Sequence, residues 1–408
     1  MGARAGLIGT NSIRDGNTRE ASTDYIVSNG GTITNAVSSR DWPGEAAVSV
    51  SMVNWVKGPC AGPHSLLVDG HVYERALIAP HLQLHTDLSG AKPLKTNASG
   101  TSQGMIMGSK LFELPPSHAP RLRQDRTAGQ FVRAVADATR LYTGRLEVNP
   151  NFAVDMSACE TEAAARKGGQ AFEFLRANVL PYVRSKGSTY EGWIDRWWQP
   201  WRPRDDFFRD VVGKTRLVAC SAHAARPVFV FLSRLFFPTH SLQLFAFDDD
   251  YSFGTLQSNI HWNWAVVQGS KIEERTRYTV EVWTTFPWPQ EPTETEVAAV
   301  AAAARDLRRV RDTLIKENGW SLRALYQAAE VPGPHPLKDA QAALDEAVQR
   351  AYGMPADQEA TAFLLELNQL VAEDEAEGRK VQGPGVPSGL DARDPRWMSD
   401  DCIEPPGL

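Results

Sequence analysis

The first sixty residues alternate between stretches with strand-like and helix-like spacing. Residues 5–9, Ala-Gly-Leu-Ile-Gly, form a short apolar run, and a polar exit follows at Thr10, Asn11 and Ser12. A short apolar run without alternation is typical of a buried strand in a parallel sheet. We therefore expect a buried parallel strand at the start of the chain.

A helix and two further strands are predicted to follow. The helix covers residues 20–28, where either Thr18 or Ser22 can cap the first turn, and an Asn-Gly-Gly stop ends it. Strands are expected over residues 32–38 and 48–53, the second with the two-residue period of a half-buried strand. Because an apolar first strand needs neighbours along both edges, these strands indicate the final part of a larger α/β sheet.

The next region, residues 61–290, has a less regular pattern of short strands and many prolines. Eight of the twelve tryptophans lie between Trp193 and Trp288. One helix is predicted behind a Ser252 cap, because apolar residues recur there at spacings of three and four. These residues are Phe253, Leu256, Ile260, Trp264 and Val267. The pattern predicts a mixed α+β domain.

The chain beyond residue 290 has helical spacing. Thr293 and Glu296 occupy capping-box positions at the start of a long helix. Two more helices are predicted over residues 337–352 and 356–377. The Pro- and Gly-rich residues 379–408 contain few apolar side chains, so we expect a disordered tail.

These patterns divide the chain into four regions. We expect α/β strands over residues 1–60, an α+β domain over 61–290, a helical region over 291–378 and then the tail. The helical region contains 8 basic and 17 acidic residues. An acidic surface repels the phosphates of nucleic acid, so this region is unsuited to grip DNA along its full face.

The overall charge does not favour a nucleic-acid-binding protein. The 408 residues include 43 Lys and Arg against 49 Asp and Glu, a net charge of -6, so any anion-binding surface must be local. Cysteines at 60, 159, 220 and 402 form no Cys-x-x-Cys pair, which argues against a zinc module or a dense disulfide scaffold. Without a secretory signal or an apolar run that could span a bilayer, we expect a soluble, cytoplasmic protein with no membrane partner.

One stretch departs from this acidic balance. Residues 184–237 contain ten Lys or Arg against five Asp or Glu, interleaved with Trp193, Trp197, Trp198 and Trp201. Basic residues beside aromatic ones suit nucleic acid, because cations meet phosphates while rings pack against bases and sugars. The alternative is that the tryptophans are core and the arginines form a solvated rim.

Three blocks near the N-terminus resemble the later motifs of large adenine-specific DNA methyltransferases. They are Gly6-Leu-Ile-Gly-Thr-Asn-Ser-Ile13, Asp41-Trp-Pro-Gly-Glu-Ala-Ala-Val-Ser-Val50 and Asn54-Trp-Val-Lys-Gly58. Further blocks are Ser102-Gln-Gly-Met-Ile-Met-Gly108, Trp201-Arg-Pro-Arg204, Phe245-Ala-Phe-Asp-Asp-Asp-Tyr-Ser-Phe-Gly254, Arg277-Tyr-Thr279 and Thr285-Phe-Pro-Trp-Pro289. The ordered series covers roughly residues 5–375. It is similar to fused type IIL restriction-modification polypeptides and related phage-defence methyltransferases.

The resemblance implies a partial class I methyltransferase sheet, followed by a DNA target-recognition domain and a helical region. It also implies methyl transfer from S-adenosylmethionine to the N6 amine of adenine in double-stranded DNA. Because that amine lies inside the duplex, the base has to rotate out of the stack, at a cost of about a few kcal/mol.

Three residues at strand ends are implicated by the resemblance. Trp42 occupies the position where the family stacks an aromatic ring on the flipped adenine, and such stacking is worth roughly 1–3 kcal/mol per base. Asn11 and Ser12 lie where the carboxyl end of a strand should open onto the substrate crevice. The alternatives are that Trp42 fills the turn before a strand and that the polar residues merely end one.

In the recognition domain the resemblance favours DNA contact by the basic segment. Arg202 and Arg204 flank Pro203, so both side chains are expected to project from one extended face. Arg145, in Thr143-Gly-Arg145, matches a recurrent family position whose role is open. An arginine can bind phosphate or recognise guanine bidentately. The other candidates, mostly for phosphates, are Arg184, Lys186, Arg196, Lys214, Arg216 and Arg226.

The chain lacks two motifs on which the family's chemistry depends. It contains neither the Asn/Asp-Pro-Pro-Tyr/Phe motif, which accepts hydrogen bonds from the target amine, nor the Gly-rich cofactor loop. Asn149-Pro-Asn-Phe152 has Asn in place of the second proline. We therefore expect the chain alone to be inactive, with S-adenosylmethionine bound mainly by residues of a missing N-terminal half or of a separate subunit. A non-catalytic DNA-binding specificity subunit and a non-functional fragment are the competing hypotheses.

Two other chemistries are less well supported. Asp248, Asp249 and Asp250 could ligate a hard cation, but the helix that follows them makes a helix-entry turn the better explanation. His261 could act as a general base, yet no partnered nucleophile accompanies it, which favours a packed or surface histidine. We predict no metal site.

Overall fold

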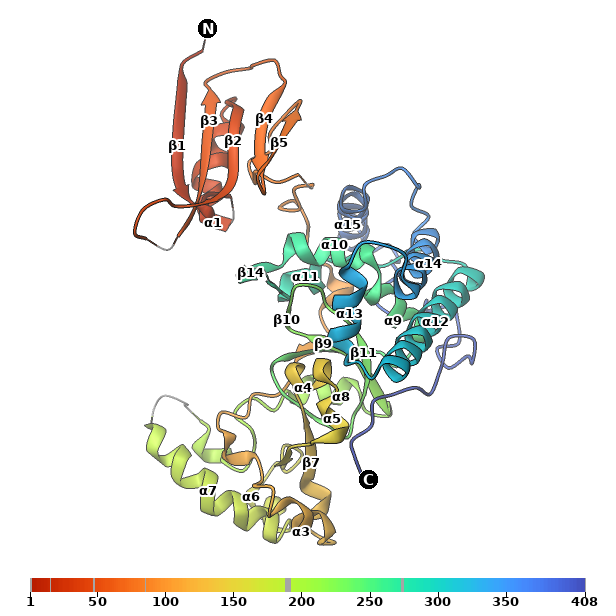
Figure 1. Ribbon diagram of the computed structural model, residues 1–408. Coiled ribbons are helices and arrows are strands. Elements are labelled where there is room, and N and C mark those ends of the chain that lie inside the picture. Colours follow the sequence, from red (N-terminus) through yellow and green to blue (C-terminus); the bar gives the residue numbers. More distant parts are fainter. Residues whose placement is uncertain are drawn as a thin grey trace. The chain divides into compact units, whose positions relative to one another are not determined.

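The protein folds into two compact units, Met1–Gly90 and Ala91–Leu408 (Figure 1). A computed structural model describes residues 2–14, 16–46, 48–84, 86–187, 192–272 and 275–407.

The first unit is a five-stranded sheet with one helical segment. Strand β3 lies between β1 and β2 and runs antiparallel to both, whereas β2 and β4 are parallel; the order is β1-β3-β2-β4-β5. Strands β1 and β2 therefore point the same way, and their carboxyl ends lie at the same edge. The strands are β1 (Arg4–Thr10), β2 (Thr32–Asp41), β3 (Ser49–Val56), β4 (His64–Val68) and β5 (His71–Arg75).

A helical run joins β1 to β2 and covers one face of the sheet. It consists of α1 (Gly16–Arg19), a π-helical turn (Glu20–Asp24) and α2 (Tyr25–Ser28). The predicted helix over residues 20–28 is thus confirmed but begins earlier. The core beneath it is small and aliphatic, and its members are Ile13, Ile33, Ala36, Val53, Leu66, Val68, Ile78 and Leu82.

Two predictions for this region are wrong. Strand β1 is not a buried parallel strand, because it lies at the edge of the sheet, pairs antiparallel with β3, and leaves Ile8 59% exposed. A short apolar run looks the same in a buried strand and in an edge strand. The boundary at residue 60 is also wrong, since β4 and β5 continue the same sheet and the unit extends to Gly90. The other edge of β1 has no strand partner among the described residues.

The second unit begins with three small sheets, and its predicted α+β character is confirmed. One sheet is antiparallel, with the order β11-β9-β13-β6. The second has the order β12-β7-β8 and the third the order β10-β15-β14. The strands are β6 (Thr101–Gln103), β7 (Val132–Ala136), β8 (Phe152–Val154), β9 (Arg216–Ser221), β10 (His223–Ala224), β11 (Val230–Ser233), β12 (Phe237–Pro238), β13 (Leu242–Phe245), β14 (Ser270–Ile272) and β15 (Arg275–Arg277).

Short helices connect these strands, and one longer helix, α7, packs on a core rich in tryptophan. Helix α7 buries Phe172, Leu175 and Val179 in the same cluster as Trp193 and Trp197. The helices of this part are α3 (Ala119–Gln124), α4 (Ala138–Thr143), α5 (Arg145–Val148), α6 (Glu162–Arg166), α7 (Gln170–Lys186), α8 (Asp205–Asp210), α9 (Asp250–Gln257), α10 (Asn259–Gln268) and α11 (Val280–Thr285).

The helix predicted behind Ser252 is two helices. The Asp249 side chain, not Ser252, caps α9 by accepting a hydrogen bond from the Ser252 N–H at 2.7 Å. Ser258 ends α9 and caps α10 by accepting from the His261 N–H. All residues of α9 are buried, so apolar spacing alone does not reveal where one helix stops and the next begins.

The helical region agrees well with the sequence pattern. Thr293 and Glu296 form the predicted capping box at the start of α12. The two later predicted helices correspond to α14 and α15, whereas α13 was not predicted. Among the described residues, no helix is both long and apolar enough to cross a membrane. The four helices are α12 (Glu294–Asn318), α13 (Leu322–Glu330), α14 (Pro336–Ala351) and α15 (Ala360–Ala376).

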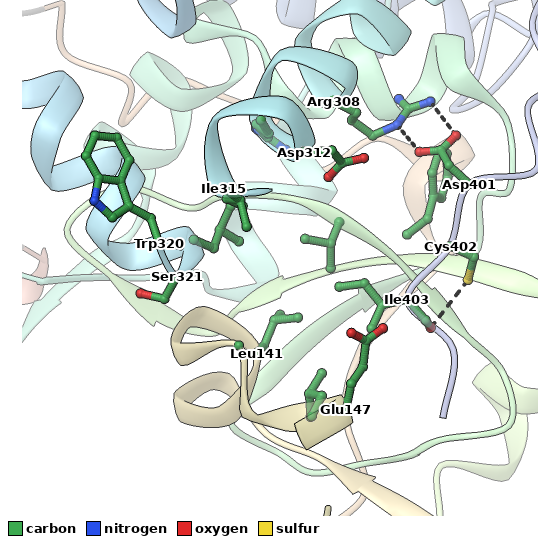
Figure 2. Close-up of a pocket in the computed structure, with 16 residues that line it drawn as sticks. Leu141, Glu147, Arg308, Asp312, Ile315, Trp320, Ser321, Asp401, Cys402 and Ile403 are labelled. Carbon is green, nitrogen blue, oxygen red and sulfur yellow. Dashed lines mark hydrogen bonds and ion pairs between the residues drawn. The ribbon is translucent and has the colours of Figure 1, made fainter. Parts of the chain in front are cut away.

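The expected disordered tail is ordered as far as Gly407. Trp397 is fully buried, and its Nε1 donates to the Asp391 carbonyl at 2.9 Å. Ile403 exchanges backbone hydrogen bonds with β11, and Asp401 forms an ion pair with Arg308 at 2.6 Å (Figure 2). The low apolar content of this segment predicted disorder, but its few apolar side chains pack on the rest of the unit and not on one another.

Candidate nucleic-acid interface

Two segments far apart in the sequence pair to form the centre of the candidate site. Ile106 and Arg202 exchange backbone hydrogen bonds of 3.1 and 3.0 Å. On its other side, residues 104–107 hydrogen-bond to residues 238–242. We call residues 104–107 together with 201–204 the paired ribbon.

Glycine makes this close pairing possible. A Cβ added to Gly104 would lie 2.2 Å from the Thr239 carbonyl oxygen, so any side chain there would push the segments apart. Gly108 has a φ of +80°, and a Cβ on it would meet the Trp193 ring at 2.5 Å. Both glycines belong to the block from Ser102 to Gly108.

A hollow of about 730 Å³ opens beside the paired ribbon. Arg145 enters it from the start of α5, directly after Gly144, whose left-handed conformation ends α4. Trp201 and Met107 supply an apolar part of the wall. We call it the Arg145 hollow, and its cationic and amide side chains are Lys110, Arg140, Arg145, Asn149 and Asn151.

The cations of this hollow differ in whether they form ion pairs within the protein. Arg140 donates to the Asn149 carbonyl at 2.7 Å and forms an ion pair with Asp137 at 3.2 Å. Arg145 and Lys110 form no ion pair with any described residue. Sequence analysis missed Lys110 and Arg140; Lys110 comes just after the Ser102–Gly108 block, whereas Arg140 has no local signal.

Arg202 is exposed beside this hollow. Its guanidinium lies over the Trp201 ring, with 4.8 Å between the guanidinium carbon and the ring centroid. Stacking on an aromatic face restricts the guanidinium without neutralising it. The structure thus brings Arg145, Trp201 and Arg202 together from distant parts of the chain.

The expectation that Arg202 and Arg204 project from one extended face is wrong. Arg204 adopts a left-handed conformation with φ +65° at the start of α8, where the chain turns. Its side chain lines a different hollow, and its Nε donates weakly to the Gly104 carbonyl at 3.4 Å. Burial lowers the pKa of the Arg204 guanidinium, and neighbouring Arg202 lowers it further.

Three of the four tryptophans in the basic segment are core. Trp193, Trp197 and Trp198 are at most 4% exposed. Trp193 donates its indole N–H to the Gln199 carbonyl, and Trp198 donates to the Cys159 carbonyl. Only Trp201 reaches the surface of this segment, so the core interpretation is right for the first three.

Some predicted DNA-binding cations are held by partners inside the protein. Arg216, 4% exposed, donates to the carbonyls of Asp248 and Asp401, so the prediction that it contacts DNA is wrong. Lys214 forms an ion pair with Asp248 at 2.5 Å. Arg226 donates to the Asn259 side chain at 2.6 Å.

The remaining predicted cations lie elsewhere on the second unit. Arg184 is exposed in the last turn of α7, and the Lys186 ammonium lies 4.7 Å from the centre of the Tyr182 ring. Arg196 is exposed in a short 3-10 turn. None of the three lines the Arg145 hollow, and their contact with DNA stays a prediction.

The predicted residues of the first unit lie at the carboxyl edge of β1 and β2. Asn11 donates to Ser39 Oγ at 2.8 Å and accepts from Ser51 Oγ at 3.2 Å. The Ser12 and Thr10 hydroxyls are 2.7 Å apart. Trp42 directly follows β2, is 43% exposed, and has its backbone N–H bonded to the Val48 carbonyl at 2.9 Å. The structure therefore places Asn11, Ser12 and Trp42 along one edge.

The residues at this edge do not by themselves fit S-adenosylmethionine. The Asn11 side chain is already bonded to neighbouring serines, and the turn Asn11–Arg14 contains no glycine. Nucleotide-binding turns need glycine so that the backbone can approach the ligand. The turn Asn11–Arg14 thus does not fit the cofactor by itself.

The aspartate run is a structural network. Asp249 caps α9, Asp248 forms an ion pair with Arg393 at 2.7 Å, and Asp250 pairs with Arg308. Burial raises the pKa of Asp249 to about 6. No group of three or more His, Cys, Asp or Glu among the described residues is arranged to hold a metal ion.

His261 is a core residue. It is fully buried, with Nδ1 2.7 Å from the Leu256 carbonyl oxygen and Nε2 3.0 Å from the Tyr278 hydroxyl. Burial lowers the pKa of His261 to about 4. Because both ring nitrogens have hydrogen-bond partners inside the core, the histidine has a packing role.

Another hollow, of about 420 Å³, lies between α12 and the C-terminal segment (Figure 2). Leu141, Ile315 and Ile403 form much of its wall. The guanidinium of Arg308 at this hollow is neutralised by Asp250 and Asp401. A neutralised cation has little attraction for phosphate, so this hollow is not a candidate for DNA.

Comparison with known proteins identifies part of this unit. Residues 227–290 match the family model described as MmeI, target recognition domain. A structure of the type IIL restriction-modification enzyme MmeI, solved in complex with DNA, is similar with a TM-score of 0.70 and 18% sequence identity, over 91% of this chain and 50% of that chain. The chain thus spans about half the length of that enzyme, and no curated protein matches it in sequence. Residues 227–290 are therefore similar to the MmeI target recognition domain, and the chain shares its fold with part of that enzyme.

Proposed function

We propose that this chain is the target-recognition part of a restriction-modification enzyme that methylates adenine N6 in double-stranded DNA. The match of residues 227–290 to the MmeI target recognition domain is the observation that carries the proposal. The complex of the structurally similar MmeI with DNA supports DNA as the partner.

The Arg145 hollow and the neighbouring Arg202 supply the DNA-binding chemistry in this proposal. Arg145, Lys110 and Arg202 form no ion pair with a described carboxylate. Free guanidinium and ammonium groups bind phosphates, and a guanidinium can also recognise guanine bidentately. Since the whole chain has a net charge of -6, attraction for DNA has to come from such a local set.

Trp42 would stack on the adenine once it has left the duplex. Its partly exposed ring lies at the sheet edge that also carries Asn11 and Ser12, whose polar groups would face the extruded nucleotide. Stacking worth roughly 1–3 kcal/mol would offset much of the cost of unstacking, which is about a few kcal/mol.

Methyl transfer itself would need residues that this chain lacks. S-adenosylmethionine would supply the methyl group, and the motifs for the cofactor and the target amine would belong to a further part of the same polypeptide or to a separate subunit. One edge of β1 pairs with no strand of the described residues, which supports such a partner, because an open strand edge can accept another strand.

DNA binding is tested with the purified 408-residue chain and a pool of random-sequence duplexes. Affinity should fall steeply as salt rises, because phosphate contacts release counterions. The double variant Lys110→Gln/Arg145→Gln should bind more weakly, while Arg166→Gln serves as the control, because Arg166 is an exposed arginine paired with Glu162. No binding at low salt, or equal affinity of both variants, would contradict the proposal.

A methyl-transfer assay distinguishes this proposal from the alternative, a non-catalytic specificity subunit. The absence of both motifs is the observation that favours the alternative. The chain alone should incorporate no methyl group into DNA. Complemented with a polypeptide that carries both motifs, it should methylate adenine. Activity of the chain alone would contradict the argument from missing motifs, and inactivity of the complemented enzyme would favour the specificity subunit.

Base stacking is tested in the complemented enzyme with a fluorescent adenine analogue at the target position. Trp42→Ala should reduce the signal that reports extrusion of the base. Tyr25→Ala is the matched control, because Tyr25 is a 65% exposed aromatic residue on the helix of the same unit. An unchanged signal in Trp42→Ala would assign Trp42 to packing of its turn.

A further inference from the structure

A second hollow, of about 450 Å³, lies at the other end of the paired ribbon. Its wall includes Gln103 at the end of β6, Arg204, and Arg277 at the end of β15. We call it the Arg277 hollow. Arg277 falls within the segment that matches the target recognition domain, and the Arg277-Tyr-Thr279 block has no role in the function proposed above.

Two polar side chains of this hollow make no hydrogen bond with a described residue. The exposed Arg277 guanidinium forms no hydrogen bond or close ion pair with any described residue, although the Glu281 carboxylate lines the same hollow and interacts with it electrostatically. The Gln103 side-chain amide likewise has no hydrogen-bond partner among the described residues. By contrast, Asn97 donates to the carbonyls of Trp283 and Phe286 and belongs to the core.

Two guanidinium groups therefore share one recess, in which Glu281 is the one carboxylate among the described lining residues, so cations outnumber anions there. Arg204 is half-buried and is held there by a left-handed backbone, a conformation that costs a non-glycine residue free energy. Partly desolvated cations are stabilised by an anion that accepts hydrogen bonds from both. A phosphodiester has the charge and the acceptor oxygens that suit two guanidinium groups and an amide.

The two hollows lie along neighbouring parts of one stretch of chain. Met105, Ile106 and Met107 line the Arg145 hollow, and Thr101, Ser102 and Gln103 line the Arg277 hollow. A duplex bound along this stretch would therefore meet cations at both hollows.

We propose that Arg277, with Arg204 and Gln103, binds a backbone phosphate of the duplex DNA that the Arg145 hollow also contacts. This proposal rests on the proposed DNA-recognition function. It leaves the exposed Arg202, between the hollows, in the position that faces the base edges.

The test uses the full 408-residue chain and the pool of random-sequence duplexes, with affinity measured over a range of salt concentrations. Arg277→Gln should weaken binding and reduce the slope of log affinity against log salt by about 0.9, the value for one lost phosphate contact. The sequences recovered from the bound fraction should not change. Arg277→Lys keeps the charge and should retain most of the slope, and Arg166→Gln should match the unmodified chain.

The outcomes separate this proposal from the function on which it rests. An unmodified chain that binds without salt dependence overturns both. If the unmodified chain and a folded Arg277→Gln variant show the same steep slope of log affinity against log salt, only the phosphate site is overturned. A changed sequence preference in Arg277→Gln also overturns it, because Arg277 would then contact a base. Thermal unfolding of each variant establishes that the compared proteins are folded.

Discussion

Arg216 and Arg308, beside Asp250, are buried and paired, whereas the arginines around Trp201 are exposed and lack carboxylate partners. Arg308 is 6% exposed and Arg216 4% exposed, and each forms ion pairs with both Asp250 and Asp401. Burial lowers the pKa of Arg216, although the two carboxylates oppose this shift. Near Trp201, Arg145 and Arg202 extend into solvent.

The comparison shows that partners decide what an arginine does in this fold. A buried guanidinium with its carboxylates holds α9, α12 and the C-terminal segment together, and removal of either partner leaves an uncompensated charge. An exposed guanidinium contributes little to folding and is available to phosphate. Each of the following predictions changes one side of this comparison.

The largest effect is expected for the interior network. Arg308→Ala leaves the Asp250 carboxylate buried with weaker pairing, and should lower the free energy of unfolding by about 3–5 kcal/mol. Arg202→Ala should change it by less than about 0.5 kcal/mol. Denaturant unfolding measures both. Equal losses of unfolding free energy in the two variants would show that the buried and the exposed arginines do not differ in their contribution to folding.

Asp249 tests the cost of a buried carboxylate that forms no ion pair with a described residue. Its pKa is about 6 in the folded protein against 3.8 normally, so the folded state binds more protons across this window and stability falls as pH rises through it. Asp249→Asn keeps a good helix cap without the charge. At pH 7 the variant should be more stable than the unmodified chain by an amount on the order of 3 kcal/mol, at roughly 1.4 kcal/mol per pKa unit.

That advantage should disappear towards pH 4, where Asp249 is protonated. Unfolding measured from pH 4 to pH 7 checks this difference. Asp357→Asn, at an exposed carboxylate, should follow the unmodified chain throughout. Parallel pH profiles for Asp249→Asn and the unmodified chain would show that burial does not perturb Asp249.

Lys214 and Arg202 should show opposite effects on stability and DNA binding. Lys214→Gln removes an ion pair with a buried carboxylate and should cost roughly 1–2 kcal/mol of stability, with DNA affinity unchanged. Arg202→Gln should weaken DNA binding a few-fold and leave stability unchanged. Unfolding and salt-dependent binding are measured on both variants. Weaker DNA binding by folded Lys214→Gln would place Lys214 in the interface after all.

The smallest effect is expected for the ring beneath Arg202. Trp201→Leu should weaken DNA binding by about 0.5–1 kcal/mol, the contribution of an exposed cation–π contact that orients the guanidinium. In the double variant with Arg202→Gln this loss should vanish, because the ring would no longer have a cation to orient. Additive losses would indicate that Trp201 contacts DNA independently of Arg202.

Local signals predicted the parts of the fold that depend on neighbours in the sequence. The Thr293–Glu296 capping box and the α12 spacing are confirmed because a helix start is determined within one turn. The strands over residues 32–38 and 48–53 are also present, with β2 and β3 extending a few residues further. The edge position of β1 and the break at Ser258 depend on tertiary packing and were not predictable from spacing.

The candidate site was predicted only in part, for the same reason. The family resemblance pointed to Arg145 and Arg202, but their proximity depends on the pairing of residues 104–107 with 201–204. Arg216 looked like Arg202 in the sequence, because its partners at Asp248 and Asp401 lie far along the chain. Charge composition cannot distinguish a cation with a distant partner from a free one.

The contact of Ile403 with β11 also has a consequence for the edge of the sheet. β11 is the outer strand of its sheet, and Ile403 forms backbone hydrogen bonds with it. An open strand edge can pair with another chain, so a segment that covers it protects the protein from aggregation. Proteolytic removal of the segment that carries Trp397 and Ile403 would expose both this edge and the site that the Trp397 ring fills.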